Sequence, residues 1–131
     1  MLRNDWKFDY TANKLAEAAA EKMSHHRERL DWWRNKKDEV MASIRSEGIE
    51  IDEKIVLSSY QSPKSRDWDR GAQVKVRNDL RNDLDECLDK LQYHTQKLAE
   101  YDGWNQVLLA NPENRVALDI DDWLFFFSKT N

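Results

Sequence analysis

Turn-forming residues are scarce in this sequence. Its 131 residues include three glycines and two prolines, whereas an all-β protein or an α/β enzyme needs many more such residues in its turns. Long helices need few turns. The scarcity therefore favours an all-α chain.

Cysteine and long apolar runs are also nearly absent. Cys87 is the only cysteine, so it cannot form a disulfide within one chain, and its place in an apolar heptad pattern, described below, predicts a buried thiol. The longest uninterrupted apolar stretch, residues 123–127, is too short to cross a membrane, and residues 1–6 lack the apolar core of a signal peptide. We therefore expect a cytoplasmic protein without membrane contact.

The balance of charge shows no excess of bases. The 25 acidic residues outnumber the 21 Lys and Arg residues, and the formal net charge is -4. The chain as a whole therefore lacks the strongly basic character of many nucleic-acid and membrane-surface proteins. Six tryptophans, four tyrosines and four phenylalanines argue against disorder. We expect one helical-hairpin domain over residues 1–131.

Two heptad patterns are the main feature of the sequence. In the first, apolar and a few polar residues recur at alternating spacings of three and four: Ala16, Ala19, Met23, His26, Leu30, Trp33, Lys37, Val40 and Ile44. The second repeats this spacing: Leu80, Leu84, Cys87, Leu91, His94, Leu98, Tyr101, Asn105 and Leu108. Each stripe must be buried against another helix, so the chain is predicted to form a long, coiled-coil-like antiparallel helical hairpin.

An antiparallel alignment of the two stripes sets which residues face each other. In the register that we favour, the numbers of facing residues sum to about 124, which places Trp33 opposite Leu91 in an apolar layer. A slip by one heptad, to a sum near 117, is the alternative and would place Lys37 opposite Leu80.

Capping and breaking residues predict the bounds of the first helix. Thr11 can cap a helix over residues 12–47, and Gly48 is a suitable residue to end it. Residues 48–77 then form a tip with a polar loop at its centre, flanked either by helical extensions or by a β-ribbon.

The second helix is expected over residues 78–110. Asn78 or Asp79 can cap its start, and Pro112 lies just beyond its end. Gly103 is a place where the helix can bend or break earlier.

Aromatic residues gather near both ends of the chain. Residues 6–10 and 116–120 alternate in polarity, so they can pair as a minor two-stranded β element. Asp121 and Asp122 are expected to open a last short helix over residues 123–127 in the tail, residues 111–131. We predict that the tail folds back into an aromatic end-cluster of Trp6, Phe8, Tyr10, Tyr101, Trp104, Trp123, Phe125, Phe126 and Phe127.

Bases flank the stripe of the first helix, whereas its acids lie farther out. With Trp32, these bases form a candidate interaction surface, called here the cationic border: Lys22, Arg27, Arg29, Trp32, Arg34 and Lys36. Their stems can simply cover the edge of the stripe, with their charges in water. They can instead meet acidic groups of another protein, or hold nucleic-acid phosphates beside a stacked base.

Several apolar residues fall outside the two stripes, so the buried face is wider than a simple pair of helices requires. These residues are Trp32, Met41, Leu88, Trp104 and Leu109. Either two hairpins associate into a four-helix bundle, or the aromatic tail covers part of the excess.

No motif in the sequence is typical of an enzyme. His25, His26 and His94 lack the spacing of a zinc site, so we interpret His26 and His94 as polar layers that specify the register, with metal binding as the alternative. Ser24 and His25 point about 100° apart around a helix, so they do not suggest a nucleophile and its base. The three glycines are too far apart for a phosphate-binding loop. We expect no enzymatic activity, no cofactor and no metal.

These observations predict a non-enzymatic interaction or scaffolding module. It would self-associate as a homodimer or bind a partner protein through its coiled-coil faces. The alternative is a nucleic-acid-binding accessory protein that uses the cationic border, and a more remote one is a metal-dependent enzyme built on the three histidines and nearby acids.

Overall fold

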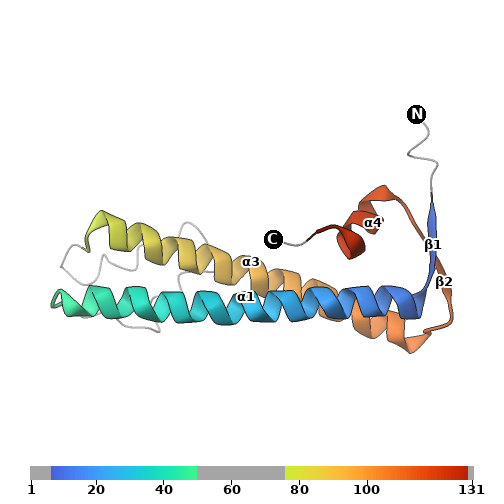
Figure 1. Cartoon of the computed structure of the whole chain (residues 1–131), viewed down its shortest axis with the longest axis horizontal. Coiled ribbons are helices and arrows are strands. Elements are labelled where there is room, and N and C mark those ends of the chain that lie inside the picture. The colour runs from blue at the N-terminus through green and yellow to red at the C-terminus, as the bar shows by residue number, and fades with distance from the viewer. Residues whose placement is uncertain (1–6, 50–75, 130–131) are drawn as a thin grey trace. The chain divides into compact units, whose positions relative to one another are not determined.

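Two long helices dominate the fold. The computed structural model describes residues 7–49 and 76–129. Its elements are β1 (Phe8–Thr11), α1 (Ala12–Ser46), α3 (Asn78–Ala110), β2 (Arg115–Leu118) and α4 (Ile120–Phe127). The long helices α1 and α3 pack against each other as a hairpin, with a small antiparallel sheet of β1 and β2 (Figure 1). The predicted helical hairpin with a minor β element is confirmed.

Helix α1 begins and ends close to the predicted positions. The Thr11 hydroxyl accepts a hydrogen bond from the backbone N–H of Lys14 at 3.2 Å, so Thr11 caps the helix as expected. The helix ends at Ser46, and the N–H of Gly48 bonds to the carbonyl of Arg45 at 3.0 Å. Gly48 has φ +83°, a left-handed conformation that glycine adopts without strain. The predicted tip, residues 48–77, lies outside the described residues except at its two ends.

Helix α3 covers the predicted residues but starts differently. Its first backbone hydrogen bond joins the N–H of Arg81 to the carbonyl of Arg77 at 2.9 Å, so Arg77 holds the N-cap position. The prediction that Asn78 or Asp79 caps this helix is therefore wrong. Asp79 lies in the first turn, where its carboxylate is 3.4 Å from the Arg77 guanidinium. The helix continues through Gly103 without ending there.

The sheet joins the two ends of the chain, as the alternation of residues 6–10 and 116–120 predicted. In the register of β1 and β2, Phe8 pairs with Leu118 and Thr11 with Arg115. The helix that follows, α4, starts at Ile120 and therefore three residues before the predicted position. The cause is Asp119, which is extended and accepts a hydrogen bond from the N–H of Asp122 at 2.8 Å. Asp121 and Asp122 lie in the first turn.

The chain divides into two compact units, each of which contains part of both long helices. The first unit, called here the sheet unit, comprises residues 1–28 and 96–131. Its helix segments are joined where the Asn105 side-chain amide donates to the carbonyl of Ala16 at 2.9 Å. Its core is one cluster of buried residues: Ala12, Leu15, Ala16, Ala18, Ala19, Met23, Tyr101, Leu108, Leu118 and Phe126.

The second unit, called here the distal unit, comprises residues 29–95. The Arg77 guanidinium lies 3.2 Å from the Glu47 carboxylate at one end of its two helix segments. The numbers of this pair sum to 124, the sum that the favoured register predicts. Stripe residues are buried on both helices: Leu30, Trp33, Val40, Ile44, Leu80, Leu84, Cys87 and Leu91.

Leu84→Ala tests the burial of the stripe. The Leu84 side chain has no exposed surface, so its truncation should lower the free energy of unfolding by about 2–5 kcal/mol through lost burial and a residual cavity. Urea unfolding followed by circular dichroism measures this loss. Glu86→Ala, an exposed change in the same helix, should stay within about 0.5 kcal/mol of the parent. Equal losses in the two variants would contradict burial of the stripe.

Candidate interaction surfaces

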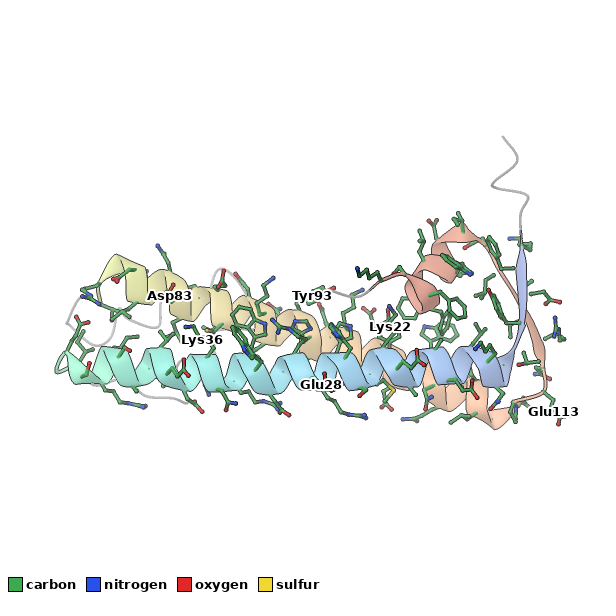
Figure 2. All side chains as sticks on the ribbon, in the orientation of Figure 1. Lys22, Glu28, Lys36, Asp83, Tyr93 and Glu113 are labelled. Atoms are coloured by element: carbon green, nitrogen blue, oxygen red, sulfur yellow. The ribbon has the colours of Figure 1, made fainter. Side chains whose placement is uncertain are left out.

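The cationic border does not form one exposed surface. Lys22 is buried at 8% exposure, and its Nζ donates a hydrogen bond to the carbonyl of Ser128, just after α4. Figure 2 shows Lys22 on the side of α1 that faces α4. Burial lowers the pKa of Lys22, and the neighbouring Glu21 carboxylate partly opposes that effect. The prediction that Lys22 belongs to an exposed interaction surface is therefore wrong, because α4 covers this position.

Arg29 and Trp32 form a cation–π pair in the distal unit. The Arg29 guanidinium lies 4.9 Å from the ring centre of Trp32 and 5.9 Å from that of Trp33. Trp32 is 49% exposed, whereas Trp33 is buried. The indoles therefore hold the charge of Arg29 at the surface, next to an open aromatic face.

The remaining bases of the border are exposed. Arg34 lies 3.4 Å from the carboxylate of Asp31, and Lys36 lies 3.9 Å from that of Glu39. Both pairs join residues three positions apart on a solvent-exposed helix face, so each stabilises α1 by a few tenths of a kcal/mol at most. Arg27 is exposed in the sheet unit. Only Arg29 among these bases is held against exposed aromatic surface.

Polar residues of the stripes are buried within the helices' contact faces, as the sequence predicted. His26, Lys37 and His94 are exposed by only 2%, 5% and 3%. The Lys37 ammonium lies 3.2 Å from the Asp38 carboxylate. The ring of His26 stacks on that of Tyr101, with centroids 5.8 Å apart. These residues form polar layers inside the stripes.

The aromatic end-cluster lies in the sheet unit. Tyr101 stacks on Phe125 with centroids 4.3 Å apart, and its hydroxyl donates to the Phe125 carbonyl at 2.6 Å. The Trp123 indole donates to the hydroxyl of Tyr10 at 3.0 Å, which ties α4 to β1. Rings of both chain ends pack together or on the core beneath them: Phe8, Tyr10, Tyr101, Trp123, Phe125, Phe126 and Phe127.

Trp6 and Trp104 are the two remaining residues of the predicted cluster. Trp6 lies outside the described residues. Trp104 is 52% exposed and belongs to the surface of α3, so its predicted place in the cluster is wrong. The buried stripe of this helix passes through Tyr101, Asn105 and Leu108, which leaves Trp104 at its edge.

Other apolar residues outside the stripes divide into two groups. Met41 and Leu88 are buried at 1% and 0% exposure. The exposed group includes the predicted Trp32, Trp104 and Leu109, together with three residues that the sequence analysis missed: Tyr93, Val107 and Leu124. The spacing of Ala99, Gly103, Val107 and Ala110 is the signal that could have drawn attention to Val107, because these residues form a second uncharged stripe on α3.

The candidate chemical groups do not converge on a reactive site in the described residues. Burial raises the pKa of the Cys87 thiol to about 11, although the nearby Lys36 partly lowers it. Cys87 is thus a protonated, unreactive thiol at neutral pH. Within residues 7–49 and 76–129, no group of three or more His, Cys, Asp or Glu side chains could hold a metal ion.

Comparison with protein-family models, with curated proteins and with solved structures found no match to this chain. Of the helices that the structure describes, none combines the length and apolar character that crossing a membrane requires.

The capping carboxylate of Asp119 provides a pH test of the end-cluster. The hydrogen bond from the N–H of Asp122 holds the pKa of Asp119 below its ordinary value of 3.8. Its contribution to stability should therefore be complete above that value and be lost as the pH falls through the lower, folded-state pKa. The amide proton shift of Asp122, measured by NMR, should move in that range. In Asp119→Asn, where the cap remains but no longer titrates, this movement should vanish; its persistence would rule out the Asp119 cap as its source.

Proposed function

We propose that this protein is a non-enzymatic interaction module that self-associates or binds a partner protein through exposed faces of its helices. The observation that carries the proposal is the pair Trp104 and Val107 on α3. They are three residues apart, so they lie on one face of the helix, and they are 52% and 62% exposed.

Trp104 and Val107 are not part of the core of the sheet unit. That core already contains Tyr101 and Leu108 from the same helix, together with the rings of α4. Covering large apolar groups that face water lowers the free energy, and aromatic residues are enriched in protein interfaces. The arrangement supports a role in binding rather than in folding for Trp104 and Val107.

Association of the full chain tests this proposal. Sedimentation velocity of fluorescently labelled protein should show species larger than the monomer, either in buffer at high concentration or in an extract of its source cells. The double variant Trp104→Glu with Val107→Glu should lose them, because burial of a carboxylate in an apolar contact is unfavourable. Ala20→Glu with Asn35→Glu adds the same charge at exposed positions of α1 and serves as the control.

Loss of the larger species in the α3 variant alone supports the proposal. Monomers in both buffer and extract would contradict it, as would equal effects of the two double variants. Circular dichroism of each variant establishes that the helices remain folded.

The second candidate function is binding of single-stranded nucleic acid, and the Arg29–Trp32 pair favours it. A guanidinium can hold a phosphate while an exposed indole stacks on a base. If the protein acts in this way, fluorescence anisotropy of a mixed-sequence oligonucleotide should show binding at low salt. Arg29→Ala with Trp32→Ala should weaken it about 10-fold or more, whereas Arg34→Ala, a base paired with Asp31, should have a small effect. Unchanged anisotropy at low salt would exclude this function.

A further inference from the structure

Arg29 is a base of the distal unit that no carboxylate of the described residues neutralises. Its guanidinium contacts the indoles of Trp32 and Trp33, and it forms no ion pair or hydrogen bond within residues 7–49 and 76–129. The next three bases along α1 each lie near a carboxylate of the same helix: Arg34, Lys36 and Lys37. The donors of the Arg29 guanidinium are therefore available to a further acceptor.

Lys36 lies one heptad after Arg29 on the same side of α1. Seven residues span about 10 Å of helix, and the exposed Trp32 comes between the two bases. Lys36 also lies close to α3, because its charge partly lowers the pKa of the Cys87 thiol that burial raises. Arg29 and Lys36 therefore flank the contact between the two helices.

Helix α3 adds a third base to this edge of the contact. In the register whose facing numbers sum to about 124, which the pair of Arg77 and Glu47 fits, residues 29–36 face residues 88–95. Lys90 is exposed and immediately precedes a buried stripe residue, as the two bases of α1 do. In an antiparallel pair of helices, these equivalent flanking positions lie along one edge. We call this edge the basic edge, and it comprises Arg29, Trp32, Lys36 and Lys90.

Acids of α1 near the basic edge compensate its charge only in part. The Glu28 side chain starts about 100° away around the helix from the residue that follows it. Asp31 lies 3.4 Å from Arg34, so its charge is already paired. Glu39 lies 3.9 Å from Lys36 in an exposed pair, which is worth little in water. Lys36 is therefore still able to attract another carboxylate.

On α3, the acids lie at one end of the facing segment. Asp89 is exposed at that end, and residues 90–96 contain no acid. Besides burial and the Lys36 charge, the carboxylates of Glu86 and Asp83 act on the pKa of the Cys87 thiol, so these acids lie toward the Lys36 end of the edge. The positive charge is therefore least compensated at the Arg29 end.

We propose that the basic edge binds an acidic helix of a partner protein, whose carboxylates one heptad apart meet Arg29 and Lys36 while an apolar side chain covers Trp32. The proposal rests on the proposed interaction function and names the chemistry of a partner at a second face of the molecule. Charged positions that flank a helix contact select the partners of paired helices. A planar guanidinium held against an indole is also oriented in advance for a carboxylate.

The spacing of the charges favours a helix over a strand of nucleic acid. A nucleic-acid strand gains affinity by placing several successive phosphates on bases. Along the basic edge such a strand would also meet the exposed carboxylate of Glu39. A helix presents one side chain to this edge about every seventh residue, so it can place uncharged or basic groups opposite that acid.

Binding of a synthetic peptide to the full chain tests the proposal. The probe is a fluorescently labelled peptide of about 20 residues, long enough to be helical, with two glutamates seven positions apart and a leucine between them. A matched peptide carries glutamine at both positions. Fluorescence anisotropy at low salt should show binding of the glutamate peptide, with an affinity about 10-fold or more above that of the glutamine peptide. The affinity should fall at physiological salt, where charges are screened beyond about 8 Å.

Substitutions in the full chain locate the contact. Arg29→Gln with Lys36→Gln should weaken binding of the glutamate peptide about 10-fold or more. Arg27→Gln with Arg34→Gln is the matched control, because these exposed bases are also seven positions apart but lie roughly 160° away around α1. The control should stay within about 2-fold of the parent, whereas Lys90→Gln, a change on α3, should weaken binding about 3-fold. Circular dichroism of each variant establishes that the helices remain folded.

Four results would overturn the proposal: equal binding of the two peptides, no binding of either peptide, equal losses in the two double variants, or tighter binding of a mixed-sequence single-stranded oligonucleotide at the same residues. Self-association of the parent that is lost in Arg29→Gln with Lys36→Gln would also overturn it, because the occupant would then be a second copy. The proposed function has its separate test in sedimentation of the variant at Trp104 and Val107, so the two failures are distinguishable.

Discussion

Burial of the two heptad stripes is the constraint on which the rest of this structure depends. A helix of 35 residues such as α1 has no interior of its own, so its apolar edge is protected from water only by another helix. Helix α3 provides that protection within the same chain. With the stripes paired, the ends of the chain can meet as β1 and β2, and α4 can close the aromatic end-cluster over them.

The bounds of α1 and the buried faces of both long helices could be predicted well because capping residues and heptad spacing act on residues nearby in the chain. Thr11 and Gly48 delimit α1 through hydrogen bonds to residues three positions away, and the heptad spacing extends over the whole of both helices. Pairing of residues near 8 and 118 could also be predicted, since both segments alternate in polarity and must lie at the same end of an antiparallel hairpin.

The errors at Lys22 and Trp104 concern side chains whose burial depends on how segments distant in the chain pack together. A heptad diagram of α1 places Lys22 with the other flanking bases, and it contains no information about the end of α4, whose backbone binds the Lys22 ammonium. Trp104 was assigned to the end-cluster by its ring alone, although its position at the edge of the α3 stripe leaves it half exposed. Of the candidate border, the sequence identified the cations, while the stacking of Arg29 on the indoles required side-chain geometry.

The positions of the reactive and apolar side chains among the described residues fit an interaction role. The buried thiol of Cys87 is unreactive and the buried histidines belong to the helix contacts, whereas several large apolar side chains are exposed to water on the outside of the helices.

Amide hydrogen exchange tests the central claim, burial of the paired stripes, most directly. The account predicts slow exchange throughout the interiors of residues 12–46 and 78–110, whereas rapid exchange within residues 16–44 would contradict it.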